Sequence, residues 1–234
     1  MTPPLGSAPA FLRYSARQVF AGRFAWFLGL AVALFLLIAV IHTAEEKVPP
    51  GPDVVYYFLL VPGVVLVIYP SAYALQSEVD AGMVETLFGI PDYRYKVWLA
   101  RHAVLLLAAA AVLSGLALFC RFALADFAVH EMVFHLLFPV AFLAGAGFLA
   151  ATFTRSGNGA AAVLVLLVLA LWITAQPLEG SRWNVFYNPF DLLDEVEGLV
   201  RSGNTFHNRA YLLAGSVLAV LGGLLRLQRR ERFV

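Results

Sequence analysis

The chain is short of charged residues. Asp, Glu, Lys and Arg make up 13% of its 234 residues, whereas ordinary soluble proteins hold about 25%. Hydrophobic residues reach 61%. A soluble core of this size cannot bury so much apolar surface, so a bilayer has to surround most of the side chains. The composition therefore predicts an integral membrane protein.

Other absences exclude further classes of function. Cys120 is the single cysteine, which excludes an intrachain disulfide and a thiolate metal cluster. The net charge is +1 and the basic residues do not cluster, so we expect no nucleic-acid partner. The pattern G-x-x-x-x-G-K-[ST] of an ATP-binding loop is missing, so the chain is not expected to be an enzyme by itself. No bound cofactor is predicted.

Long apolar runs are what the chain does have. Six of them approach or exceed the roughly 20 residues that a helix needs to cross about 30 Å of hydrocarbon. The runs are continuous rather than alternating, which favours helices over a barrel. The prediction is an all-α integral membrane protein with one domain over residues 1–234 and six spans. They are Phe24–Ile41, Val54–Leu75, Val97–Leu124, Val129–Phe153, Ala160–Ala175 and Ala210–Leu227.

The basic residues predict the orientation. Of the 16 Lys and Arg residues, eleven fall on the side of the N-terminus and the last span's end. The five on the opposite side are Lys47, Arg121, Arg182, Arg201 and Arg209. Because basic residues concentrate on the cytoplasmic side, we predict that both termini are cytoplasmic. The expected location is a bacterial cytoplasmic (inner) membrane.

Two amphipathic helices are predicted outside the spans. Residues 9–23 are predicted to form an interfacial helix. Phe11 and Phe20 are suited to contact lipid chains, and Arg13 and Arg17 to contact lipid headgroups. Residues 188–200, in the last external loop before the sixth span, combine helical apolar spacing with acids on the other face. Asn188 is suited to cap this second helix, and Pro189 to occupy its first position.

The segment between the second and third spans has the most informative pattern. It carries acids in its first half and bases in its second, with a glycine and a helix-breaking proline between them. Such a segment cannot lie in hydrocarbon, so it has to lie on one membrane face, where a soluble protein can contact it. On the predicted topology this face is cytoplasmic.

This segment resembles the first cytoplasmic loop of type-2 ABC transporter permeases (the ABC-2 type). The shared pattern is Glu-x-acid-x-Gly-x-x-Glu-x-Leu-x-x-x-Pro-x-x-Arg, with a further base seven residues later. The matching residues are Glu78, Asp80, Gly82, Glu85, Leu87, Pro91, Arg94 and Arg101. Asp80, Met83 and Arg101 depart mildly from the usual Glu, Thr and Lys. The motif covers about 24 residues, while the six spans and the two amphipathic helices are similar to the family's architecture over the whole chain.

The resemblance implies a partner and a role. In such permeases the loop, residues 77–96 here, forms a coupling helix that docks on a separate ABC ATP-binding subunit, where ATP and Mg²⁺ are bound. Two six-span subunits, identical or related, assemble with two ATPases into an exporter. The uncharged middles of the predicted spans favour an apolar, amphipathic or lipid-like substrate. The alternative is a non-transporting membrane anchor or assembly protein that recruits a cytoplasmic partner through the same loop.

Three weaker patterns were open to two interpretations. His130 and His135 are five residues apart, which turns the imidazoles away from one another on a helix, so a zinc site is disfavoured. Small residues at four-residue spacing in the fourth and sixth spans favour packing within one subunit over a dimer seam. The last external loop holds four aromatic residues that suit an interfacial belt better than a substrate path. They are Trp183, Phe186, Tyr187 and Phe190.

Overall fold

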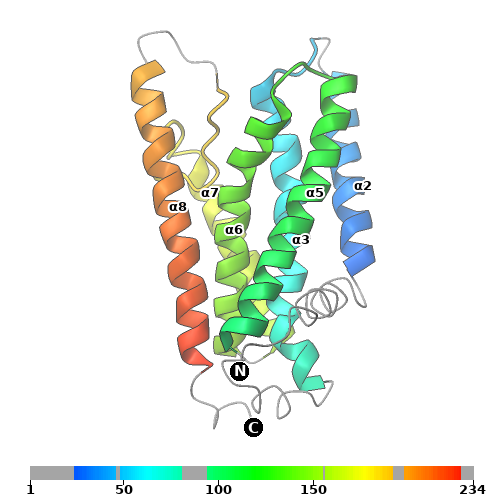
Figure 1. The fold of residues 1–234 in the computed structure, drawn as a ribbon. Coiled ribbons are helices and arrows are strands. Elements are labelled where there is room, and N and C mark those ends of the chain that lie inside the picture. The colour runs from blue at the N-terminus through cyan, green and yellow to red at the C-terminus, as the bar shows by residue number, and fades with distance from the viewer. Residues whose placement is uncertain (1–23, 46–47, 81–93, 155, 192–197, 228–234) are drawn as a thin grey trace, which may run out of the picture.

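The protein is a bundle of long helices that run side by side (Figure 1). The computed structural model describes residues 24–45, 48–80, 94–154, 156–191 and 198–227. The elements in chain order are α2 (Phe24–Glu45), α3 (Pro52–Asp80), the π-helix η1 (Arg94–Leu99), α5 (Ala100–Ala123), α6 (Val129–Thr154), α7 (Gly157–Ala175) and α8 (Gly198–Arg226).

Six of these helices are long and apolar enough to cross a membrane, as the sequence predicted. Their candidate spans run from 19 residues in α7 to 27 residues across η1 and α5. The main difference lies in the sixth span. We predicted its start at Ala210, but α8 begins at Gly198 and its candidate span at Ser202. Arg209 therefore lies within a membrane-spanning helix rather than in a loop.

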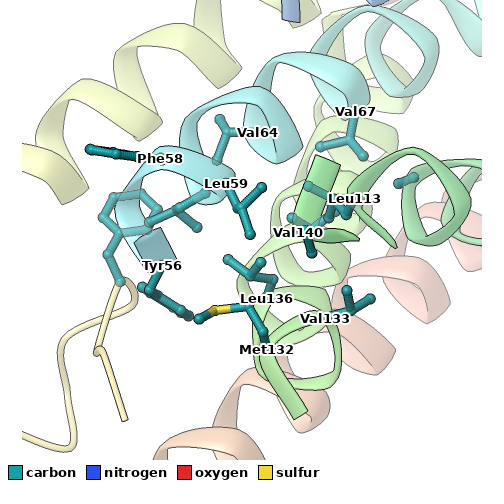
Figure 2. Packing of buried hydrophobic residues seen from close by; sticks show 14 of the residues in the cluster. Tyr56, Phe58, Leu59, Val64, Val67, Leu113, Met132, Val133, Leu136 and Val140 are labelled. Atoms are coloured by element: carbon teal, nitrogen blue, oxygen red, sulfur yellow. The ribbon is translucent and has the colours of Figure 1, made fainter. Parts of the chain in front are cut away.

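Helix α6 occupies the centre of the bundle, in contact with α3, α5, α7 and α8. Its inward face packs large apolar side chains against those of α3 and α5. Figure 2 shows Met132, Leu136 and Val140 of α6 beside Leu59 of α3 and Leu113 of α5. Met132, Leu136, Leu59 and Leu113 are fully buried. Contacts of this kind, which hold helices together in lipid by close packing, fix the relative position of these three helices.

The end of the bundle where α2 begins and α8 ends is called the terminal end, and the opposite one the loop end. The terminal end has its own buried core, the terminal-end cluster, which joins five elements. It consists of Ala72 and Leu75 of α3, Val97 and Trp98 of η1, Phe148 and Ala151 of α6, Ala160 of α7, Val220 and Leu224 of α8, and Leu227.

Small residues bring the helices close together within this one chain. A Cβ atom at Gly145 of α6 would lie 3.1 Å from the Ser216 carbonyl oxygen of α8. The Ser216 hydroxyl donates a 3.0 Å hydrogen bond back to the Ala141 carbonyl. On α8, Gly215 faces the Phe142 ring and Gly223 the Phe148 ring. The small residues of the fourth and sixth spans thus pack within the subunit, as the sequence favoured.

The predicted external helix does not begin where the sequence placed it. Residues 188–191 form turns rather than a helix, and residues 198–200 belong to the start of α8. Asn188 does accept a backbone hydrogen bond, from Phe190 N–H at 3.0 Å, but that bond closes a local turn. Residues 192–197 of this prediction lie outside the described part, as does the interfacial helix predicted at 9–23.

An even number of spans places the start of α2 and the end of α8 on the same side of a membrane. We expect Ser156→Cys, at the terminal end, and Asp126→Cys and Glu179→Cys, at the loop end, to react with a membrane-impermeant maleimide from opposite sides. All three residues are exposed. The native Cys120 is buried and gives little background. Labelling of all three from one side of the membrane would contradict the six-span topology.

Candidate functional sites at the two ends of the bundle

Both flanks of the charged 78–101 segment are anchored in the terminal-end cluster. Leu75, before the segment, has 5% of its surface exposed; Val97 and Trp98, near its end, have 2% and 5%. The Trp98 ring lies 5.6 Å from the Phe148 ring of α6, centroid to centroid. Both flanks thus pack into the buried cluster that also contains residues of α6 and α8.

The structure places the eight motif residues at different depths. Glu78 and Asp80 lie in the last turn of α3, and Arg94 begins η1. Gly82, Glu85, Leu87 and Pro91 lie outside the described residues. Arg101 lies near the start of α5 and is buried, with 5% exposed.

The buried position of Arg101 differs from that of a docking residue. The centre of its guanidinium lies 5.1 Å from the Trp98 ring centroid, a cation–π geometry. Arg101 thus contacts a residue of the terminal-end cluster, and in the single chain it is not part of an exposed docking surface. Its position suits it to hold the start of α5 against that cluster.

Helix α3 is also tied to the start of α7 at this end. The Gln76 side-chain oxygen accepts a 3.1 Å hydrogen bond from Gly157 N–H, and the Tyr73 hydroxyl donates to the Asn158 side-chain oxygen. Gly157 is packed directly on the Tyr73 ring, where a Cβ would overlap ring atoms. The flank that precedes the charged segment therefore contacts α7 as well as α6.

The loop end holds a polar network that sequence analysis missed. Its centre is Asn208 of α8, a fully buried side chain. The Asn208 amide donates hydrogen bonds to the carbonyl oxygens of Asn184, at 2.7 Å, and Arg182, at 2.9 Å. Its side-chain oxygen accepts one from Arg209 Nη1–H at 2.8 Å. A single side chain thus joins α8 to the α7–α8 connection.

Arg209 extends this network to α6. It has 5% of its surface exposed, and its Nε–H donates to His135 Nδ1 at 3.2 Å. Its Nη2–H donates to the Tyr187 carbonyl at 3.2 Å. A guanidinium can only donate, so Nδ1 of His135 has to be an unprotonated acceptor. Among the described residues, all the hydrogen-bond partners of this buried cation are neutral.

The connection after α7 folds back into the loop end of the bundle. The Asn184 amide donates to the Ala175 carbonyl of α7 at 3.3 Å, and the Asn188 amide to the Asp53 carbonyl of α3 at 2.8 Å. Phe186 and Tyr187 are 1% and 5% exposed. These two aromatic residues therefore belong to the interior, which corrects the prediction of an interfacial belt for them, whereas Trp183 is 60% exposed.

Beside this network lies a pocket of 780 Å³ between the outer parts of α6 and α8. In Figure 1 these two helices diverge from the terminal end toward the loop end. The pocket is lined by Glu131, Phe134, His135 and Phe138 of α6, by Pro189, and by Ser202, Thr205, Phe206, Arg209, Ala210 and Leu213 of α8. It extends over three turns of α8, about 16 Å at 1.5 Å per residue.

The pocket escaped the sequence analysis for a physical reason. Arg209 was assigned to a loop because a charged residue usually ends a span. The sequence did hold one sign that the last helix starts earlier than Ala210. Residues 198–209 contain no proline, so the helix of the apolar run that follows can extend back through them. Burial of Arg209 also depends on His135, which is 74 residues away in the sequence.

The histidine pair of the fourth span does not form a metal site in the structure. His130 is exposed, whereas His135 is half-buried and contacts Arg209. Among the residues that the structure describes, no group of three or more His, Cys, Asp or Glu side chains could hold a metal ion.

Comparison with known proteins gives no match: no family model, no curated protein and no solved structure is significantly similar to this chain. Any function has to be argued from the sites themselves.

Proposed function

We propose that the chain is the membrane-spanning permease subunit of an ATP-driven exporter of the ABC-2 type. A separate ATP-binding subunit docks on the 77–96 loop, and a second permease subunit, identical or related, completes the membrane part. ATP and Mg²⁺ are bound by the partner ATPase and not by this chain. Both termini of the permease are cytoplasmic.

The observation that carries the proposal is the anchoring of the charged segment at both of its ends. A loop that only recruits a partner needs no rigid connection to the bundle. Here Leu75 on one side and Trp98 on the other pack into the same buried cluster as Phe148 and Leu224. On this proposal, force applied to the loop by a soluble partner would reach the cluster of α6 and α8 residues through these buried flanks.

The two helices that receive this force also form the pocket at the other end. In α8, Leu224 lies in the terminal-end cluster and Arg209 lines the pocket. These positions are about 22 Å apart along the helix. Because a packed helix moves as a unit, a displacement at the cluster would change the separation of α6 and α8 at the pocket. This arrangement supports transport over passive anchoring.

The proposal is tested by reversing one charge of the loop. We expect Glu85→Lys to abolish stimulation of the ATPase by the permease, because the acid at this position would face the docking groove of the partner. The matched control is Glu179→Lys, which makes the same change at an exposed residue of the loop end. ATP hydrolysis and co-purification of the ATPase are measured in reconstituted vesicles.

The outcomes separate the two functions. Loss of stimulation in Glu85→Lys alone, with normal membrane insertion, supports the exporter. If an ATPase never co-purifies with the wild-type chain, or if Glu85→Lys stimulates it normally, the coupling assignment is wrong. Co-purification of a protein without ATPase activity would favour the membrane anchor.

A further inference from the structure

We propose that the pocket between α6 and α8 binds one lipid with an acidic headgroup, whose anionic group lies on Arg209 and whose chains point toward the middle of the bilayer. This inference does not depend on the proposed function, because it concerns binding to this chain alone.

The charge of Arg209 is the first argument. A buried cation is costly unless an anion or several hydrogen bonds compensate for its lost hydration. Three of the five guanidinium N–H groups donate to His135, Asn208 and Tyr187. The centre of the guanidinium also lies 5.7 Å from the Phe138 ring centroid, but no carboxylate among the described residues forms an ion pair with it. Because the residue lines the pocket, an anion in it could accept hydrogen bonds from this guanidinium.

The gradient of polarity along the pocket is the second argument. Its outer part holds Glu131, Ser202 and Thr205. Arg209 lies about one turn beyond Thr205 on α8, and Leu213 lies one turn beyond Arg209. On α6, Phe138 lies about one turn beyond His135. A polar end, a cation and then an apolar end match the headgroup, the acidic group and the chains of a lipid in that order. A small inorganic anion would leave the deep apolar part empty.

The open side of the pocket is the third argument. Phe134, Phe206 and Leu213 line it and are 56%, 72% and 55% exposed. They lie on α6 and α8 within the candidate spans, where a bilayer would surround their exposed surfaces with hydrocarbon. A ligand can therefore enter sideways from the surrounding leaflet. Glu131, also on the pocket wall, can accept a hydrogen bond from a headgroup hydroxyl such as those of phosphatidylglycerol.

The test uses native mass spectrometry of the full chain in a neutral detergent, with phosphatidylglycerol, phosphatidylcholine or inorganic phosphate as the probe. We expect one phosphatidylglycerol per chain, held about tenfold more tightly than phosphatidylcholine, because both lipids carry a phosphate but the trimethylammonium group of choline would bring a second positive charge close to Arg209. Inorganic phosphate at the same concentration should not displace the lipid. Arg209→Gln should remove the preference for the acidic lipid.

Two further variants keep the result interpretable. Arg182→Gln removes an exposed arginine at the same end of the bundle and should leave the preference unchanged. Phe206→Glu adds a negative charge at an exposed position on the pocket wall, so it should weaken acidic-lipid binding even if Arg209→Gln misfolds. Equal affinity for the two lipids, or an unchanged preference in Phe206→Glu, would overturn the proposal. Competition by inorganic phosphate would show a free-anion site instead.

Discussion

Replacing Gly147 by valine will destabilise the bundle more than any change on its lipid-facing surface. Gly147 of α6 lies where α3 and α7 meet it, and a Cβ there would overlap the Ser71 hydroxyl and lie 2.8 Å from Leu164 Cδ2. Ser71 and Leu164 are themselves buried, at 3% and 0% exposed. They have no free space to move into, so three helices would have to separate.

The expected loss is about 3 kcal/mol, the upper end of the usual cost of overpacking. In a chain of this size it would lower the melting temperature in detergent by roughly 10 °C. The matched control is Gly115→Val in α5, where a Cβ would meet no atom within 4 Å. Thermal unfolding followed by intrinsic fluorescence compares the two. Similar melting temperatures would mean that α3, α6 and α7 are not packed as described.

Replacing Asn208 by leucine should have a comparably large effect at the loop end. The side chains are similar in size, but leucine makes none of the three short hydrogen bonds of Asn208. The buried Asn184 carbonyl, the partly buried Arg182 carbonyl and Arg209 Nη1–H would lose their partner, and the loss of a hydrogen bond to a buried group costs about 1–3 kcal/mol. We expect a total destabilisation of about 3 kcal/mol, together with faster proteolysis of the connection at residues 176–191.

The control for this variant is Asn204→Leu, one turn earlier on α8. Asn204 makes one exposed hydrogen bond, a 3.3 Å contact to the Gly180 carbonyl, so its replacement should cost little. Limited proteolysis and thermal unfolding measure both variants. Equal protection of residues 176–191 in the two variants would show that Asn208 does not hold the connection.

Much of the fold follows from composition and spacing. The six spans could be predicted because lipid admits only long apolar helices with internally paired backbones, and that constraint acts on each segment separately. The small residues could be assigned to helix contacts for a similar reason, since Gly145 and Gly223 permit approach whatever the partner is. The charged 78–101 segment was likewise identifiable as a break between two apolar runs, and its position outside hydrocarbon stays a prediction.

The candidate sites were less accessible to this reasoning. The motif predicted a common role for eight residues, but the tertiary structure puts Arg101 in contact with Trp98, away from any exposed surface. Hydropathy could not show that Arg101 is buried. An arginine near the start of an apolar run is equally compatible with an exposed position at the membrane surface. The role of the four motif residues between 81 and 93 remains a prediction from the resemblance.

The sequence by itself determined that this protein is an all-α membrane protein with six candidate spans, because hydropathy acts locally along the chain. Only the tertiary structure decided that Arg209 is buried and that α6 and α8 enclose a pocket. Those features depend on His135 and Tyr187, which meet Arg209 only when three segments distant in sequence pack together. Hydrogen bonds between these distant segments hold the guanidinium in place, and no pattern along one helix shows them.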